Sequence, residues 1–198
     1  MFVVSAPSGA GKTTIVKELI KETDNLYYSV SHTTRKPRKG ETDGIDYYFV
    51  SRTAFKEMIR NGEFLEWANV YDEFYGTSRK VVQDMLYQGK DVLFDLDIQG
   101  AKSIRNMFSD AVLVFVLPPS IEVLYSRLVG RGTDSENIIN MRKQKAREEI
   151  KNCSWFDYIV INDDLGTAVR DAQAVILSCR CRFLRQKEKI RICFPDLF

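Results

Sequence analysis

Residues 2–14 read FVVSAPSGAGKTT. The eight residues from Ala6 to Thr13 match the phosphate-binding pattern G-x-x-x-x-G-K-[ST] at every position except the first, where alanine replaces glycine. The apolar run before them predicts a short buried strand over 2–5, and Ile15, Val16 and Leu19 lie on one face of a helix that would follow. A strand, a glycine-rich turn and a helix start form the context in which backbone N–H groups bind phosphate.

The residues of this loop have separate expected roles. Gly9 and Gly11 allow the backbone to approach a phosphate closely, Lys12 supplies a mobile positive charge, and Thr13 offers a hydroxyl to Mg²⁺. A methyl group at position 6 is costly only where the backbone needs a positive φ or a very close approach. We therefore expect a working ATP site with these contacts: Ala6, Pro7, Ser8, Gly9, Ala10, Gly11, Lys12, Thr13 and Thr14.

Composition limits the class of protein. The 198 residues are 44% apolar and 28% charged, which is ordinary for one globular domain. A net charge of +2, from 29 basic and 27 acidic residues, gives no argument for nucleic acid or a membrane as the main partner. No apolar run reaches the roughly 20 residues that span a bilayer. Without a secretory pattern or metal-type cysteine spacing, the sequence favours a cytoplasmic protein with four reduced thiols.

Strands and helices alternate along most of the chain. Apolar runs at 2–5, 91–97, 112–117 and 158–161 predict strands, and the segments between them predict helices, the last over about 165–185. This order favours a single α/β domain over 1–198, with a central parallel sheet covered on both faces. Two stretches do not fit the sheet, and we expect insertions at its C-terminal edge: about 32–82 and about 120–155. The core would then comprise about 1–31, 83–119 and 156–198.

A carboxylate lies where a magnesium ligand is expected. Asp95 ends the buried strand predicted over 91–97, and its carboxylate would join the Thr13 hydroxyl in holding Mg²⁺, by way of water. The alternative is an ordinary turn residue at a strand end.

Beyond the loop, a set of short motifs occurs in one order along the chain. The sequence resembles the guanylate kinases in SVSHTTRKPRKGE (29–41), GIDYYF (44–49), EFLEW (63–67), YGT (75–77), DLDIQG (95–100), LPPS (117–120), GRG (130–132) and VINDD (160–164). The resemblance implies a three-layer P-loop fold that transfers the γ-phosphoryl group of ATP to GMP or dGMP with Mg²⁺, in purine metabolism and GMP recycling. It also implies that 32–82 binds GMP and that 120–155 forms a helical lid.

The resemblance assigns the acceptor site. Two guanidinium groups and two phenol hydroxyls would hold the GMP phosphate, which suits a dianion because charge-assisted hydrogen bonds are the strong ones. A carboxylate opposite the two guanine donors and a hydroxyl opposite its O6 would exclude adenine. The phosphate ligands implied are Arg35, Arg38, Tyr47 and Tyr75. The base ligands implied are Glu66 and Thr77, supported by Ser31 and Asp97.

The charged helical stretch carries three arginines, Arg127, Arg131 and Arg142. An arginine brought in by a closing lid can stabilise the charge that develops during phosphoryl transfer. Arg131 and Arg142 match the lid arginines of the family best, so they join Lys12 and Arg38 as expected catalytic residues. Arg127 and Asn162 are expected to contact ATP.

The alternative to a catalytic role for these arginines is ion pairing on a solvent-exposed helix. Their partners there would be Glu136, Glu148 and Glu149. For Arg127 the two interpretations weigh equally.

Other functions remain open on the sequence. A catalytically inactive interaction domain would lack a complete phosphate loop, and a kinase for another acceptor would lack the pair formed by Glu66 and Thr77. His32, the single histidine, is expected in a loop without a catalytic role. The apolar end at 192–198 could cover the core or form a dimer contact, and the oligomeric state is undecided.

Overall fold

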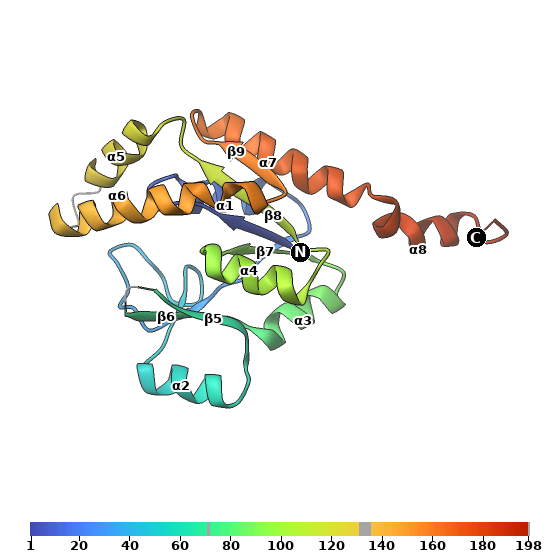
Figure 1. The fold of residues 1–198 in the computed structure, drawn as a ribbon. Coiled ribbons are helices and arrows are strands. Elements are labelled where there is room, and N and C mark those ends of the chain that lie inside the picture. The colour runs from blue at the N-terminus through green and yellow to red at the C-terminus, as the bar shows by residue number, and fades with distance from the viewer. Residues whose placement is uncertain (71, 131–135, 198) are drawn as a thin grey trace.

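The computed structural model describes residues 1–70, 72–130 and 136–197. It contains two sheets with helices around them (Figure 1). Within the described ranges, no helix is both long enough and apolar enough to cross a membrane.

The main sheet is parallel and has five strands in the order β2-β7-β1-β8-β9. The predicted α/β class and the four predicted strands are confirmed, although the second ends at Asp95 rather than residue 97. The sequence prediction missed β2, because three residues between a helix and a polar stretch carry too little pattern. The strands are β1 (Phe2–Ser5), β2 (Leu26–Tyr28), β7 (Asp91–Asp95), β8 (Val112–Leu117) and β9 (Tyr158–Ile161).

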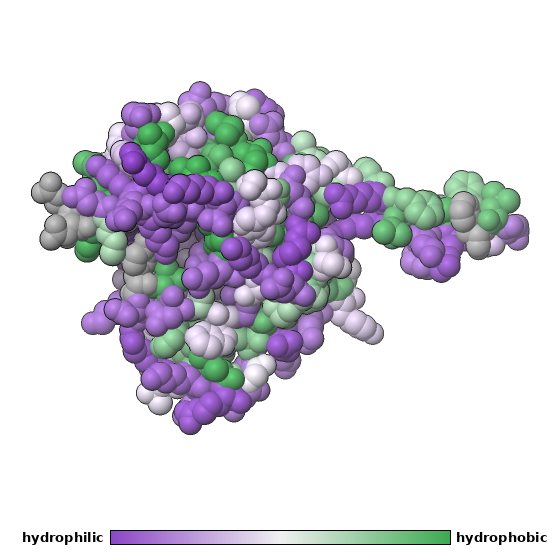
Figure 2. Space-filling model, viewed as in Figure 1, coloured by the Kyte–Doolittle hydropathy of each residue, from purple (hydrophilic) through white to green (hydrophobic). Residues whose placement is uncertain are grey.

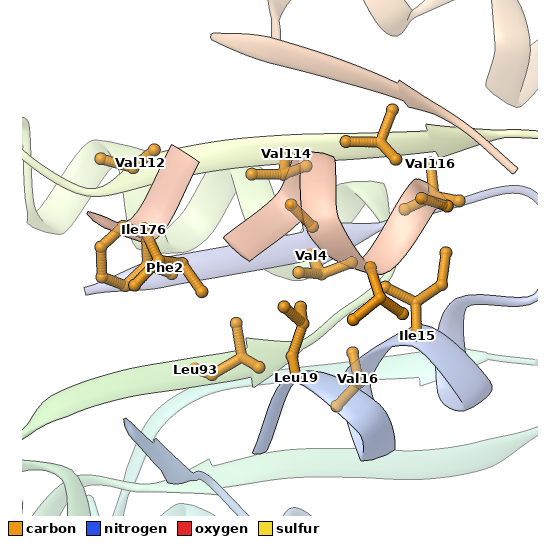
Figure 3. Close-up of a cluster of buried hydrophobic side chains, with 14 of the residues drawn as sticks. Phe2, Val4, Ile15, Val16, Leu19, Leu93, Val112, Val114, Val116 and Ile176 are labelled. Atoms are coloured by element: carbon orange, nitrogen blue, oxygen red, sulfur yellow. The ribbon is translucent and has the colours of Figure 1, made fainter. Parts of the chain in front are cut away.

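Side chains that alternate along the strands of the sheet belong to two hydrophobic clusters, one on each face. On one face, Phe2 and Val4 of β1 pack against α1 (Lys12–Glu22) and α7 (Leu165–Arg180), as Figure 3 shows for Ile15, Leu19 and Ile176. On the other face, residues such as Val3 and Phe94 pack against α3 (Arg79–Tyr87) and α4 (Ile98–Met107). Burial on both faces explains why these strands read as continuous apolar runs.

The stretch predicted as the first insertion contains a second sheet, in the order β4-β3-β6-β5. The apolar run at 47–50 also predicts a strand, and the strand observed there has only two residues. The long antiparallel hairpin was not predicted, because polar residues interrupt its apolar alternation. His32 lies in a strand, not in a loop as predicted, and stacks on Tyr48. The elements are β3 (His32–Thr33), β4 (Tyr48–Phe49), α2 (Arg52–Arg60), β5 (Phe64–Val70) and β6 (Glu73–Ser78).

The second stretch is helical, as predicted. It contains α5 (Ile121–Gly130), α6 (Glu136–Lys151) and the short 3-10 helix η1 (Cys153–Trp155). Leu124 and Leu128 of α5 pack on Ala146 of α6. The glycines at 130 and 132 predict a break in this helical stretch, and Thr133 with Glu136 resembles a capping box, but residues 131–135, Arg131 among them, lie outside the described residues.

The C-terminal segment differs from the prediction. The last long helix ends at Arg180, and a separate helix, α8 (Phe183–Cys193), projects away from the rest of the molecule (Figure 1). Asp91 fixes the junction, because its carboxylate accepts hydrogen bonds from Arg180 Nε and Arg185 Nη1, each at 2.8 Å. Leu184 is 82% exposed, and the apolar tail is visible in Figure 2. The tail therefore does not cover the core.

Ending the chain at Arg185 tests this point. Because residues 186–197 bury no core surface and both arginines at Asp91 remain, we expect Tm to change by less than about 2 °C. Leu113→Ala serves as the control: Leu113 is fully buried in β8, and its truncation should lower the free energy of unfolding by about 2–5 kcal/mol. Differential scanning calorimetry measures both, and a truncated chain as unstable as the Leu113 variant would contradict the structure.

Candidate active site

The loop after β1 closes into a tight turn. Ala10 N donates to Pro7 O at 3.1 Å, and Gly9 and Gly11 have φ of +95° and +93°, where any side chain would be strained. Ala6 is not among the positive-φ residues, which explains why its methyl group is tolerated. The loop borders a cavity of about 240 Å³, the donor cavity, whose lining includes Ala6, Pro7, Ser8, Gly9, Gly11, Lys12, Thr13 and Thr14. Ala10 is fully buried and is not part of this lining.

Asn162 supports the loop from behind. Its Nδ2 donates to Ala10 O at 2.7 Å, and a Cβ added at Gly11 would lie only 2.2 Å from the same nitrogen. Arg127 Nη2 donates in turn to Asn162 O at 3.1 Å. The two residues expected to contact ATP therefore form a chain of hydrogen bonds that holds the glycine turn in shape.

Lys12 links the loop to the neighbouring strand. Its Nζ lies 2.5 Å from Asp95 Oδ1 and donates to Leu96 O at 2.9 Å. Thr13 and Asp95 both line a cavity of about 370 Å³ between α1 and the loop before β4. A hydroxyl and a carboxylate are the hard oxygen donors that suit Mg²⁺. In residues 1–70, 72–130 and 136–197, no cluster of three or more His, Cys, Asp or Glu could hold a metal alone.

A third cavity, of about 230 Å³ and here called the acceptor cavity, lies between the two sheets. It shares Ser8, Lys12 and Asp97 with the donor cavity, so the two spaces adjoin at the loop. Among its lining residues are six of the eight predicted for the acceptor, together with one lid arginine: Ser31, Arg38, Tyr47, Glu66, Tyr75, Asp97 and Arg142.

Glu66 is the most unusual residue of the acceptor cavity. It is only 7% exposed, and Thr77 Oγ1 donates to its Oε1 at 2.5 Å. Burial raises the pKa of Glu66 to about 7, and the nearby Asp97 carboxylate adds to the rise. Asp97 itself caps α4 by accepting Gly100 N at 2.9 Å. Burial at the edge of the acceptor cavity thus penalises the ionised form of the Glu66 carboxyl group.

Two predicted acceptor residues lie outside this lining. Arg35 forms a two-pronged pair with Glu41, at 3.0 and 2.8 Å, and its guanidinium lies over the Tyr47 ring. Thr77 is fully buried, so in this structure its hydroxyl orients Glu66 rather than facing the cavity. Its predicted contact with guanine O6 remains a prediction.

Sequence reasoning missed two acidic residues at the site. Glu41 holds the loop that carries Arg35 and Arg38, because it pairs with Arg35 and also accepts a hydrogen bond from Arg38 N at 2.7 Å. Its position six residues after Arg35 was the sequence feature that could have indicated this role. Glu149 of α6 lines the donor cavity, although it was considered only as a partner for lid arginines. Its ion pair is with Lys145, at 3.8 Å, and Glu148 pairs with Lys151, at 2.8 Å.

A phosphate loop, an adjoining acceptor cavity and a neighbouring arginine-bearing helix define a P-loop phosphotransferase for a small acceptor. The guanylate kinase family model matches residues 1–178. Guanylate kinases of Carboxydothermus hydrogenoformans and Clostridioides difficile are 53% identical over 176 residues and 48% identical over 190, covering 89% and 96% of this chain and 86% and 93% of theirs. The chain belongs to the guanylate kinase family.

A solved structure agrees with this assignment. The crystal structure of guanylate kinase from Anaplasma phagocytophilum matches with a TM-score of 0.82 at 33% identity, covering 98% of this chain and 95% of that one. The predicted family and fold are therefore confirmed.

Replacing Glu66 with glutamine should stabilise the protein at alkaline pH. The pKa of Glu66 in the folded protein, about 7, lies above the ordinary glutamate value of 4.5, so the stability that the protonated carboxyl contributes is lost as pH rises from 4.5 through 7. We expect Glu66→Gln to unfold with a free energy larger by about 2–3 kcal/mol at pH 8, and the difference to vanish towards pH 4.5. Urea unfolding measures it. Glu57→Gln, on an exposed position of α2, is the control, and identical curves for all three proteins would contradict the account.

Proposed function

We propose that this chain transfers the γ-phosphoryl group of ATP to GMP, giving ADP and GDP. The observation that carries the proposal is Glu66, a buried carboxylate at the acceptor cavity, which adjoins the phosphate loop. Membership of the guanylate kinase family supports it. We also propose dGMP as an acceptor and a cytoplasmic role in purine metabolism and GMP recycling.

The donor phosphates would occupy the donor cavity. Backbone N–H groups of the loop and of the first turn of α1 would bind them, because the N-terminus of a helix favours anions. Lys12 would exchange its ion pair with Asp95, whose Oδ1 lies 2.5 Å from Lys12 Nζ, for contacts with the β- and γ-phosphates. Thr13 and Asp95 would hold Mg²⁺, because a hydroxyl and a carboxylate are oxygen ligands that suit this ion. The ion would supply positive charge that neutralises the transferring group.

Glu66 would select the base. Guanine presents two donors, N1–H and the N2 amino group, to an ionised carboxylate, whereas adenine presents an acceptor at N1. An adenine in this place would leave a buried charge without a partner, and sites of this kind discriminate by about 10⁴ or more. Thr77 holds the carboxylate in place through its 2.5 Å hydrogen bond.

The acceptor phosphate would be positioned by Arg38, Tyr47 and Tyr75, which line the same cavity. Arg35 would join them by exchanging its pair with Glu41 for the phosphate dianion. Arg142 lies beside the acceptor cavity, and we propose it, with Arg131, as the charge that stabilises the transferred group. Since the phosphate oxygen of GMP is already anionic, no general base is required.

The acceptor range tests the base selection. With ATP and Mg²⁺, we expect turnover to rise strongly with GMP and dGMP and hardly at all with AMP or UMP, because only guanine offers Glu66 two donors. A coupled assay of ADP release across the nucleoside monophosphates measures this. Comparable rates with AMP would refute guanine selection, and turnover with dTMP instead of GMP would favour a kinase for another acceptor.

Removal of the loop cation tests the donor site. Lys12→Met should lower kcat about 100-fold or more, since a charge aimed at the transferring phosphates is lost in a site sheltered from water. Lys21→Met, at the exposed end of the same helix, is the matched control and should leave kcat unchanged. Steady-state kinetics with a thermal unfolding check measure both. Near-normal activity of the Lys12 variant would remove the loop from the mechanism and favour an inactive binding domain.

A further inference from the structure

Glu149 is placed differently from the other glutamates near the end of α6. Its side chain is 16% exposed, whereas that of Glu148, one residue earlier, is 64% exposed and pairs with Lys151. Glu149 lines the donor cavity together with the glycine loop. One carboxylate of α6, which belongs to the expected lid, thus lies at the same cavity as the phosphate loop.

The surroundings of this carboxylate include groups that attract anions. The Ser8 backbone N–H and the Lys12 ammonium, at the same cavity, favour its ionised form, and Lys145 Nζ lies 3.8 Å from its Oε1. Burial raises the pKa of Glu149, and the Asp97 carboxylate raises it further, while the two lysines oppose the rise. Glu149 therefore lies at the same cavity as the loop backbone and the loop lysine, which are the donors that a phosphate would need, while the Lys12 ammonium itself pairs with Asp95.

We propose that the Glu149 carboxylate acts as a stand-in for phosphate: it holds α6 against the loop in the empty protein, and nucleotide phosphates displace it on binding. The proposal rests on the donor site of the proposed function. Glu149 is then a positioning residue rather than a catalytic one. It couples occupancy of the loop to release of the helix that carries Arg142.

The exchange has a measurable consequence for affinity. A ligand that must first displace an internal competitor binds with an apparent Kd equal to the intrinsic Kd divided by the fraction of protein in which the competitor is released. Neutralising the competitor removes this cost, so nucleotide should bind more tightly and not more weakly. A purely structural contact would give the opposite result, because its loss loosens the site.

Calorimetric titration of ADP, without acceptor, tests the proposal in the full chain. We expect Glu149→Gln to bind ADP about five- to fiftyfold more tightly than the parent. Glu148→Gln, its matched control, should bind within about twofold of the parent. Glu149→Asp keeps the charge with a shorter reach and should fall between the parent and Glu149→Gln.

Hydrogen exchange of the empty protein gives a second readout. A peptide that contains Ser8 should exchange faster in Glu149→Gln than in the parent or in Glu148→Gln, because the acceptor of its amide is weakened. Should the glutamine variant fail to fold, Glu149→Asp tests the same contact, with tighter ADP binding in support and unchanged binding against.

Equal or weaker ADP binding by Glu149→Gln, or unchanged exchange at Ser8, would overturn the proposal. If the parent binds ADP and the variant does not differ, only the displacement is refuted. If the parent itself binds no ADP, the proposed donor site fails as well, so the two failures are distinguishable.

Discussion

The parallel pairing of β1 with β7 is the constraint on which the site depends. Its register places Val4 opposite Asp95, so both strands end at one edge of the sheet, where the loop begins. Lys12 then meets Asp95 at 2.5 Å, with Thr13 beside it. One pairing thus brings together a loop cation, a strand-end carboxylate and a hydroxyl from two distant parts of the chain, and the phosphate chemistry follows from that edge.

Acceptor recognition is built at a cost to stability. The β5–β6 hairpin carries Glu66 inward against α4, where a Cβ added at Gly100 would lie 3.2 Å from Glu66 Oε2. Burial penalises the charged form of this carboxylate, which is reflected in its raised pKa. A guanine that donates two hydrogen bonds would offset the penalty, whereas an adenine would not. The cost of burying the ionised Glu66 carboxylate and the proposed selectivity for guanine therefore have the same origin.

The sequence predicted the parts that depend on local pattern. The strand–loop–helix at the N-terminus, the buried strands and the family all followed from apolar runs and from ordered short motifs. The hairpin and β2 were missed because neither has a clean alternation of apolar and polar residues. The support of Asn162 for Ala10 links residues 152 positions apart, and no local signal reveals it. Glu149 was likewise invisible, since a glutamate on a charged helix looks the same whether it faces solvent or the loop.

The central claim is that one buried carboxylate selects the acceptor. Its most direct test is the titration of the Glu66 carboxyl carbon by NMR, with and without GMP. The account predicts a midpoint near pH 7 in the empty protein, and a fully ionised Glu66 throughout the range from pH 6 to 8 once GMP is bound. A midpoint near the ordinary glutamate value of 4.5 without GMP, unmoved when GMP is added, would contradict it.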